Sequence, residues 1–393
     1  MTRLSVKELE TYLNRCVRCG QCRSVCPVFG VIRREGAAPR GKVYLAHEML
    51  HARIPLSAEA EKHLSLCLGC MACSRECPTG IPVHEIVYLA RSRLAAAVPA
   101  PARNLLYTRI WTSPSLLSGA VSLARLLQAG NLLGPRLTSH LPRNLLNTAA
   151  LQRPARSMLG EVYQPPGPAV ANITYYIGCG TNFLFPGLAR QAVSVLTSLG
   201  CRVKVSKDTA CCGLPHLAAG LPETAAGLLE RNLAALTTAG ADAVVTDCAT
   251  CYSTLAGDAG SSLRVLDLNQ LILSLPVNPG RFKEVPPRRV TCHDPCHLSA
   301  SGGTDWPRRL LASIPGLTLT EMTGSAGCCG GGGTFMLRHQ EISDALLKQK
   351  ISSLNATGAD TVTTCCPACM LQLSRGNPGL SVIHPVQLMS IQL

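Results

Sequence analysis

Two groups of four cysteines near the start of the chain have the spacing of metal ligands. Within each group the cysteines are separated by two, two and three residues, and a proline follows the last one. The groups are Cys16, Cys19, Cys22 and Cys26, and then Cys67, Cys70, Cys73 and Cys77. Runs of the form C-x2-C-x2-C-x3-C-P hold [4Fe-4S] clusters through their thiolates. Closely spaced C-x2-C pairs also suit tetrahedral Zn²⁺, but two intact runs with the trailing proline favour iron-sulfur clusters.

The two runs are expected to exchange one ligand. In the bacterial two-cluster pattern three closely spaced thiolates wrap one face of a cluster, and the fourth cysteine binds the other cluster. The first predicted ligand set is therefore Cys16, Cys19, Cys22 and Cys77. The second predicted set is Cys67, Cys70, Cys73 and Cys26.

Ten further cysteines form two copies of one pattern in the second half of the chain. Each copy has a single cysteine, an adjacent pair followed by glycine, and a C-x2-C pair. The first copy is Cys179, Cys211, Cys212, Cys248 and Cys251, and the second is Cys296, Cys328, Cys329, Cys366 and Cys369. The flanking residues repeat too, because GADAVVTDCATC ends at Cys251 and GADTVTTCCPAC ends at Cys369. A duplication explains this repeat most simply.

Five thiolates exceed what one zinc ion or one cubane cluster needs. Adjacent cysteines suit a cluster in which neighbouring irons, or one bridged iron, take both thiolates, and Gly213 and Gly330 let the backbone bend around it. Structural cysteines and disulfides are the alternatives, but ten cysteines at a duplicated spacing disfavour them. Cys201, Cys292 and Cys365 fall outside both copies and are expected to be structural, with Cys365 as an alternative ligand.

The elements that must position these cysteines differ along the chain. Helices are predicted at residues 43–51 and 59–66, before the second run. Residues 99–168 contain short Leu-rich helical segments interrupted by prolines. Strands are then predicted at 173–177, 203–205 and 243–246, with helices at 222–239 and 342–354. Cysteines follow the ends of these strands, where open parallel sheets bind ligands.

The predicted fold is therefore multidomain α+β. A helical two-cluster module is expected at residues 1–98 and a basic Leu- and Pro-rich helical linker at 99–168. Two duplicated α/β halves with small parallel sheets follow at 169–285 and 286–393.

Composition limits the setting of the protein. A chain of 393 residues with 47% hydrophobic content and 21 cysteines is globular and too long for a small disulfide scaffold. The segment MTRLSVKELETYL lacks the apolar region of a signal peptide, so we expect a reducing cytoplasm. The stretch 116–133 is interrupted by Arg125, Gln128 and Asn131, so it is not expected to span a membrane.

The chain is basic, with a formal net charge of +14. Two [4Fe-4S] clusters with four thiolates each would lower this to about +10. No acidic residue lies between Glu85 and Glu161, and this span carries Arg91, Arg93, Arg103, Arg109, Arg125, Arg136, Arg143, Arg153 and Arg156. This basic span could bind the chain to the anionic inner face of a membrane near quinone, or to a partner subunit. An ordinary solvated helix face explains the uneven charge equally well.

Several functions are not supported by the sequence. No G-x-G-x-x-G follows a strand and no G-x-x-x-x-G-K-[ST] is present, so a flavin is expected on another subunit. With 4% aromatic residues and no base-reading module, no nucleic-acid partner is expected. His293, Asp294 and His297 flank Cys296 and either orient this ligand, which we favour, or deliver protons to a substrate. Arg40 and Lys42 either ease reduction of a nearby cluster or are ordinary solvated charges.

Four segments carry a resemblance to a known family. They are APRGKVYLAHEML at 38–50, CLGCMACSRECPTGIPV at 67–83, HDPCHL at 293–298 and CCGGGGTF at 328–335. The paired CCG motifs resemble those of the B subunit of heterodisulfide reductase. The whole arrangement resembles the glycolate oxidase iron-sulfur subunit family, which is related to the anaerobic glycerol-3-phosphate dehydrogenase C subunit and to lactate-oxidation iron-sulfur proteins. The resemblance covers nearly the whole chain except residues 99–168.

The resemblance implies an electron-transfer subunit of an oxidoreductase, of the glycolate dehydrogenase type. Such a subunit takes electrons from an FAD-dependent 2-hydroxy acid oxidase partner, acting on glycolate or lactate, and passes them towards quinone without a catalytic residue or flavin of its own. The two CCG cysteine sets would bind up to two further iron-sulfur clusters, which are non-cubane in heterodisulfide reductases. The alternative is a catalytic subunit that reduces a disulfide at these clusters.

Overall fold

The computed structural model describes residues 6–98, 100–129, 153–237, 240–258, 260, 263–276, 282–377 and 379–389. The chain forms two compact units, each assembled from separate stretches of sequence. Unit 1 consists of Met1–Thr108, Gly213–Gly227 and Gly327–Lys350, and unit 2 of Arg109–Cys212, Leu228–Ala326 and Ile351–Leu393. This grouping differs from the four predicted domains, whose boundaries stay a prediction.

The regular elements among the described residues of unit 1 are all helices. Its elements are α1 (Val6–Asn14), α2 (Gln21–Ser24), α3 (Pro27–Ile32), η1 (Glu35–Ala37), α4 (Pro39–Leu50), α5 (Ala58–Ser65), α6 (Ala72–Arg75), α7 (Val83–Ala97), α8 (Pro101–Leu105), α15 (Leu214–Ala218) and α21 (Phe335–Arg338). The two predicted helices are confirmed as α4 and α5. Helix α4 begins earlier than predicted, at Pro39, because proline suits the first turn of a helix.

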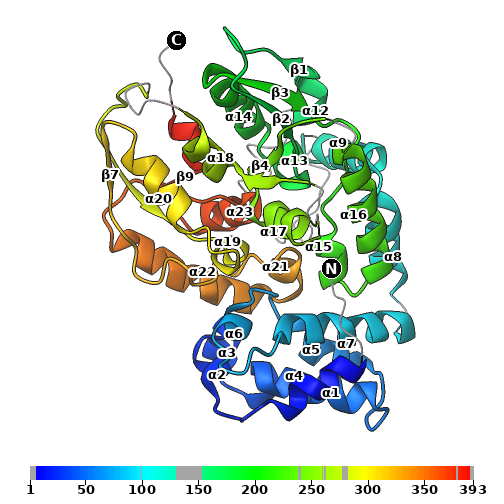
Figure 1. Cartoon of the computed structure of the whole chain (residues 1–393). Helices are drawn as coiled ribbons and strands as arrows, with labels where there is room; N and C mark the ends of the chain where they lie inside the picture. Colours follow the sequence, from blue (N-terminus) through cyan, green and yellow to red (C-terminus); the bar gives the residue numbers. More distant parts are fainter. Residues whose placement is uncertain are drawn as a thin grey trace. The chain divides into compact units, whose positions relative to one another are not determined.

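The core of unit 1 lies between amphipathic helices. Figure 1 shows α1, α4, α5 and α7 packed side by side. Leu9, Ala46, Leu64 and Ile86 from these four helices are fully buried. Apolar residues recur every three or four positions along α7, which gives this helix one buried face. Cysteines of both N-terminal runs pack against this core: Cys16, Cys67, Cys73 and Cys77.

Unit 2 contains two small sheets. The first has the order β1-β3-β2-β4-β5 and the second β7-β6-β8-β9. The strands are β1 (Val162–Tyr163), β2 (Ala171–Tyr175), β3 (Cys201–Val205), β4 (Ala243–Thr246), β5 (Val265–Asp267), β6 (Arg288–Cys292), β7 (Leu317–Leu319), β8 (Thr361–Thr363) and β9 (Ser381–Ile383). All pairs are parallel except β1 with β3. The predicted fold class is confirmed.

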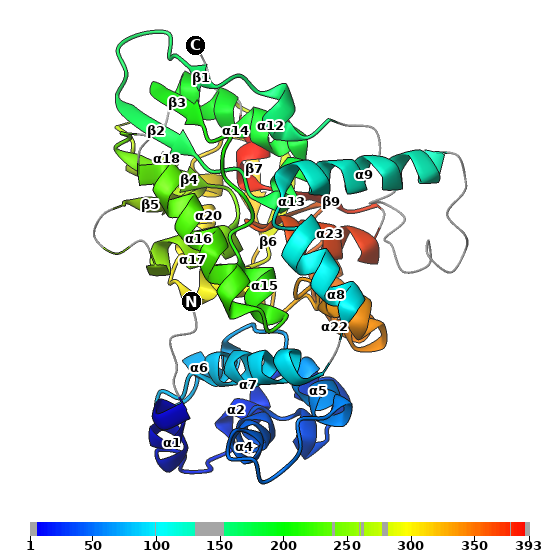
Figure 2. The ribbon, with the colours of Figure 1, turned by 90° about the vertical axis from the view of Figure 1, so that its right-hand side faces the viewer.

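Most of the remaining helices connect these strands in the manner of βαβ units. The helices are α12 (Ala155–Met158), α13 (Cys179–Phe183), α14 (Pro186–Ser198), α16 (Pro222–Thr237), α17 (Ala249–Asp258), α18 (Leu268–Ser274), α19 (Cys296–Ala300), α20 (Asp305–Ala312), α22 (Gln340–Asn355), α23 (Pro367–Gly376) and η4 (Pro385–Leu388). Of these, α12 precedes β1 and η4 follows β9. Figure 2 shows the first sheet with its strands in the order given above. In its register Ile173 of β2 lies between Val203 of β3 and Ala243 of β4.

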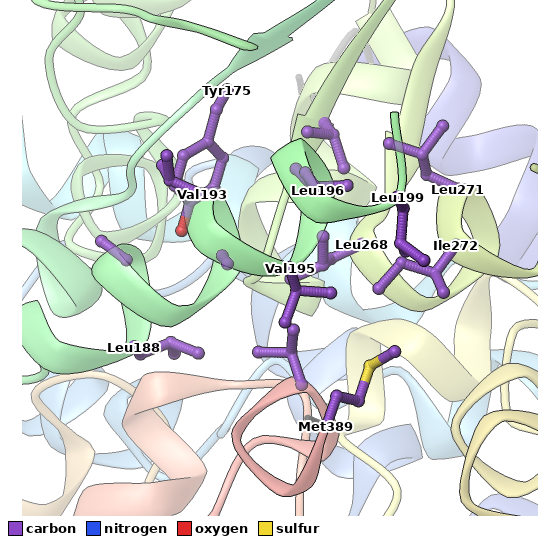
Figure 3. Packing of buried hydrophobic residues seen from close by; sticks show 14 of the residues in the cluster. Tyr175, Leu188, Val193, Val195, Leu196, Leu199, Leu268, Leu271, Ile272 and Met389 are labelled. Atoms are coloured by element: carbon purple, nitrogen blue, oxygen red, sulfur yellow. The ribbon is translucent and has the colours of Figure 1, made fainter. Parts of the chain in front are cut away.

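The two halves share one hydrophobic core. Figure 3 shows Leu188 and Leu196 of α14, Leu268 and Leu271 of α18, and Met389 packed together. The same cluster continues to Val290 and Cys292 of the second sheet. Each sheet is small, so burial against the other half supplies apolar contacts that neither half has alone.

The segment predicted as a helical linker contains a strand as well as helices. Helix α8 is followed by the π-helical η2 (Leu106–Ile110) and by α9 (Pro114–Ala129). Near the end of the segment, β1 adds an antiparallel edge strand to the first sheet. This strand was not predicted, because two residues are too few to show a strand pattern in the sequence. Residues 130–133 of the predicted apolar stretch lie outside the described residues. None of the helices that the structure describes is long and apolar enough to cross a membrane.

Candidate metal centres

The two N-terminal cysteine runs fold into loops with the same backbone shape. The second residue after Cys16 and after Cys67 has a positive φ, at Arg18 (53°) and Gly69 (67°). The residue after the second cysteine does too, at Gly20 (82°) and Met71 (59°). Left-handed residues in such a loop turn successive N–H groups inward, which forms a concave site for an anionic group.

The first predicted ligand set comes together in unit 1. Burial raises the pKa of the Cys22 thiol, and the backbone N–H of Arg40 opposes this effect. Negative charge on Cys16, Cys19 and Cys77 raises the pKa further. The fourth cysteine of the second run is thus close to three cysteines of the first run.

The second predicted set is arranged in the same crosswise way. Burial raises the pKa of Cys73 strongly, and negative charge on Cys67, Cys70 and Cys26 raises it further. Cys26 sits at the N-terminus of α3, where its Sγ accepts a hydrogen bond from the Phe29 N–H at 3.4 Å. Four thiols therefore surround each position, and all eight are partly buried except Cys19, which is exposed. This arrangement fits the donor set of a [4Fe-4S] cluster.

The two basic residues before the second run differ in their environment. Lys42 is 2% exposed, donates to the Ala37 carbonyl oxygen, and lowers the pKa of Cys26 against the larger effect of burial. The Lys42 charge is therefore not a solvated one. Arg40 instead forms an ion pair with Glu35, so its charge is largely neutralised by a neighbour.

The first CCG cysteine set follows three neighbouring parallel strands of unit 2. Cys179 begins α13 after β2, the Cys211–Cys212 pair follows β3, and Cys248 and Cys251 follow β4. Strand β2 lies between β3 and β4, so the chain crosses from β2 to β3 on one side and later continues to β4 on the other side. The carboxyl edge at such a switch point is where α/β sheets bind ligands.

The five sulfur atoms of this set form a continuous chain of contacts. Cys179 Sγ and Cys211 Sγ lie 4.0 Å apart, and their hydrogen bond lowers the pKa of Cys179 and raises that of Cys211. Cys211 also contacts Cys212, which contacts Cys251, which in turn contacts Cys248. Hydrogen bonding to these neighbours, together with burial, raises the pKa of Cys251.

This arrangement fits a metal cluster and not a disulfide. All 21 cysteines of the chain lie among the described residues, and all are free. Thiols packed this closely in a buried site cannot all ionise without a positive centre to hold them. Iron-sulfur clusters are held by several cysteine thiolates at once, so this donor set suits an iron-sulfur cluster.

Backbone and side-chain packing fix the loops of the first set. A Cβ on Gly178 would lie 2.8 Å from Cys251 Sγ, so a larger residue before Cys179 would displace this sulfur or the loop. Gly213, after the cysteine pair, has φ 94°, as the predicted bend requires. Tyr176 donates to the Ala210 carbonyl oxygen at 2.7 Å.

Two buried polar side chains also support these loops. Asn232 of α16 accepts from the Ala210 N–H at 2.7 Å and donates to the Cys211 carbonyl oxygen at 2.9 Å. Asp247 accepts from the hydroxyls of Tyr175 and Thr181, both at 2.9 Å, and burial raises its pKa to about 7. No sequence motif marks either residue. Asn232 could have been noticed as a polar residue on the apolar face of a helix.

The second CCG set is divided between the two units. Cys296 begins α19 after β6, and Cys366 and Cys369 follow β8, all in unit 2. Cys328 and Cys329 follow β7 in sequence but belong to unit 1. In unit 2, Cys366 accepts hydrogen bonds from Cys248 of the first set and from Cys369, and its pKa is lowered. In unit 1, Gly330 has φ 85° and its N–H donates to Cys328 Sγ at 3.4 Å.

The polar residues around Cys296 are held in place by neighbours. Arg308 binds both carboxylate oxygens of Asp294, at 2.7 and 3.0 Å. His297 Nδ1 lies 3.5 Å from Cys296 Sγ, and burial lowers the pKa of His297. His293 is buried as well. These contacts support the orienting role over proton delivery, because Asp294 is committed to an ion pair and His297 to the ligand sulfur.

The three remaining cysteines have contacts of the structural kind. Cys201 and Cys292 are buried in the shared core, and Cys292 Sγ lies 3.2 Å from Thr363 Oγ1. Cys365 Sγ accepts a hydrogen bond from Asn269 Nδ2 at 3.2 Å.

The arginines of the acid-free span do not all lie on one surface. Arg93, Arg109 and Arg153 are exposed, as a surface role would require. Arg91 and Arg156 instead place their guanidinium groups on backbone carbonyls beside the cysteine loops. For these two residues the surface interpretation is wrong. Arg136 and Arg143 lie outside the described residues.

Comparison with known proteins identifies two kinds of domain. Residues 12–81 match a 4Fe-4S dicluster domain. Residues 173–256 and 290–374 match two copies of a cysteine-rich domain named CCG. The matches cover all eighteen predicted ligand cysteines.

Several curated proteins resemble the chain over nearly its full length. A probable glycolate oxidase iron-sulfur subunit of Bacillus subtilis is 27% identical over 93% of this chain and 89% of its own. The glycolate oxidase iron-sulfur subunit of Escherichia coli is 23% identical, and the match covers 93% of this chain and 91% of the E. coli protein. The D subunit of the dihydromethanophenazine:CoB–CoM heterodisulfide reductase of Methanosarcina barkeri is 26% identical. This match covers 94% of the present chain and 90% of the D subunit.

Among solved structures, an aspartate racemase homologue from Pyrococcus horikoshii covers 55% of this chain and 94% of its own. Its TM-score of 0.26 and identity of 13% are too low to inform the fold. The relatives named above are subunits of oxidoreductases, and this chain matches them over most of their length. The protein belongs to the iron-sulfur proteins that join one 4Fe-4S dicluster domain to two cysteine-rich CCG domains.

Proposed function

We propose that this chain is the electron-transfer subunit of a 2-hydroxy acid oxidase or dehydrogenase complex that acts on glycolate or lactate. It would accept electrons from an FAD-carrying partner subunit and pass them towards quinone. The observation that carries the proposal is the set of eighteen cysteines in one chain. Eight are gathered crosswise in unit 1, and the other ten lie in the two CCG domains. The chain is also similar to glycolate oxidase iron-sulfur subunits over most of their length.

The proposed cofactors are two [4Fe-4S] clusters in unit 1 and up to two further clusters at the CCG sets. Such clusters carry electrons one at a time, at potentials that the surrounding protein sets. The chain supplies thiolates as ligands and backbone N–H groups that donate to the ligand sulfur atoms. One example is the Gly69 N–H, whose nitrogen lies 3.4 Å from Cys67 Sγ. The chain also supplies nearby cations, such as Lys42 beside Cys26.

The proposed site of action is the inner face of a cell membrane, where quinone is found. Helix α9 leaves Leu116, Leu123 and Leu126 between 55 and 71% exposed, in a span without acidic residues. Exposed leucines among arginines are typical of a peripheral contact with anionic lipid. No membrane-spanning helix is needed for such a contact.

The experiment that tests this proposal uses the chain together with its FAD-carrying partner. Purified under anaerobic conditions, the pair should reduce a quinone analogue when glycolate or lactate is added. The partner alone should reduce it much more slowly. Quinone reduction that is equally fast without this chain would contradict the proposal.

The alternative is a catalytic subunit that reduces a disulfide at the CCG sites. Two observations favour it: both CCG sets are complete, and Cys248 of the first contacts Cys366 of the second within unit 2. The match to a heterodisulfide reductase subunit of Methanosarcina barkeri supports it too. Disulfide reduction by the isolated chain with a one-electron donor, and no stimulation of quinone reduction, would favour this alternative.

A further inference from the structure

Arg156 ties together two loops of the first CCG site. Its guanidinium Nη1 donates to the Thr209 carbonyl oxygen and Nη2 to the Ile177 carbonyl oxygen. Thr209 lies two residues before Cys211, and Ile177 lies two residues before Cys179. The Arg156 backbone N–H also donates to Asn182 Oδ1 at 2.9 Å. The guanidinium is therefore fixed where two ligand-bearing loops meet.

The positive charge of Arg156 has no carboxylate partner among the described residues. The ion pairs found there do not include Arg156, and its Nε atom is buried without a hydrogen-bond partner. Its ionisable neighbours are the Tyr176 hydroxyl and the thiols of Cys179, Cys251 and Cys211, and negative charge on them would oppose the lowering of the Arg156 pKa by burial. A buried guanidinium stays protonated and is costly unless an anion lies close to it. An anionic cluster at this site would meet that need.

Arg91 has the same features at the second N-terminal site, within unit 1. Its Nη2 donates to the Leu64 and Cys67 carbonyl oxygens at 2.8 and 2.7 Å, and Nη1 donates to the Ala218 carbonyl oxygen at 2.9 Å. Its Nε atom is likewise buried without a hydrogen-bond partner. The Cys67 thiol is its first anionic neighbour. Each unit thus holds one arginine fixed on the backbone of a cysteine loop.

We propose that Arg156 is the fixed counter-charge of the first CCG site, and that it raises the reduction potential of the cluster bound there. Arg91 does the same at the second N-terminal site. This inference rests on the proposed function, because it requires a redox cluster at each site. Reduction adds one negative charge, and a cation held in a poorly solvated position stabilises the reduced form more than the oxidised form. Both residues are positioning residues that do not bind substrate.

The test is an EPR-monitored redox titration of the full-length holoprotein. In Arg156→Gln the charge is lost but a hydrogen-bond donor remains, and in Arg156→Lys the charge remains. Arg153→Gln is the matched control, because Arg153 lies three residues away and is exposed, where solvent screens its charge. Arg91→Gln is the reciprocal variant.

In Arg156→Gln the ratio of reduced to oxidised cluster at the first CCG site should fall at least tenfold at a fixed potential, a shift of about 59 mV for one electron. Arg156→Lys should stay within about threefold of the wild type, and Arg153→Gln should not shift. Arg91→Gln should shift a signal of the N-terminal clusters alone.

An unchanged potential in Arg156→Gln, with full iron content, would overturn the inference. If Arg156→Gln does not retain its cluster, Arg156→Lys decides: a tenfold fall there would show that the charge is not what matters. Loss of the cluster in both variants would also overturn it, since the arginine would then be needed for assembly alone. A wild-type protein without iron at the CCG sites would instead contradict the proposed cofactors, which makes the two failures distinguishable.

Discussion

Gly178 and Cys251 lie so close together that a side chain on the residue before Cys179 would displace the Cys251 sulfur or the loop. The backbone of Gly178 is extended, with φ −65° and ψ 162°, so its conformation does not demand glycine. The demand is one of space, since a Cβ would lie 2.8 Å from Cys251 Sγ. Even one methyl group would therefore push apart two predicted ligands of the first CCG site.

Gly178→Ala should remove iron from the first CCG site and leave the N-terminal clusters in place. The reason is the displacement of Cys251 or Cys179 from its position. Iron and acid-labile sulfide per chain, measured after anaerobic purification, should fall by about four atoms each.

Gly227→Ala is the matched control for this variant. Gly227 lies in α16, and a Cβ added there meets nothing within 4 Å. Alanine in a helix should keep all the iron and stabilise the protein by about 0.5–1 kcal/mol. Wild-type iron content in Gly178→Ala would show that the first CCG loops are not held as tightly as the structure indicates.

At the residue scale, spacing predicted the cysteines but not their supporting side chains. Runs such as Cys16 to Cys26 and the duplicated CCG sets are readable because the ligands lie close together in sequence. Arg156 carries no such signal, since its partners are backbone carbonyls of distant residues, Thr209 and Ile177. Any residue type supplies a carbonyl, so the sequence cannot mark the partner.

At the scale of elements, α16 supports the cysteine pair that follows β3. Its buried face consists of apolar residues except for Asn232, which is fully buried and bonds to the backbone on both sides of the Ala210–Cys211 peptide. The helix thereby satisfies two backbone groups that the irregular loop leaves without partners of its own.

Asn232→Ala should lower the free energy of unfolding by about 2–4 kcal/mol, because it leaves a buried N–H and a buried carbonyl unpaired. Alanine favours helices more than asparagine, so propensity cannot cause this loss. Anaerobic guanidinium unfolding followed by circular dichroism measures it. Asn355→Ala, at an exposed position in α22, is the control. Equal stability of the two variants would contradict the role assigned to Asn232.

The elements themselves were largely predictable from local sequence. Strand β4 has the predicted bounds, and β2 begins two residues earlier than expected, at Ala171, because it pairs with Cys201 at the start of β3. The two-residue strand β1 was missed because its pairing with β3 is a tertiary contact and leaves no period in the sequence.

At the scale of the whole molecule, the duplication was visible but the division into units was not. The two halves share one core, which includes Leu196 from the first half and Val290 from the second. Residues 213–227 and 327–350, both after a cysteine pair, group with the N-terminal module. Such grouping depends on contacts between distant segments, which neither composition nor periodicity records.

The uneven charge of the molecule predicts binding to anionic vesicles. At low ionic strength the protein should sediment with vesicles that contain phosphatidylglycerol and not with phosphatidylcholine alone, and salt should release it. The double variant Leu123→Glu and Leu126→Glu should weaken this binding several-fold. Leu337→Glu, at a leucine of unit 1 that is 50% exposed, is the control. Equal binding of all three proteins to anionic vesicles would contradict a docking role for α9.

We propose that all four cysteine sets hold iron-sulfur clusters. The most direct test is the iron and acid-labile sulfide content of the anaerobically purified protein, with EPR, beside Cys212→Ser and Cys329→Ser. We predict about sixteen irons per chain, with a different signal lost in each variant. About eight irons, unchanged by either substitution, would confine the clusters to the N-terminal module and contradict the assignment of the CCG sites.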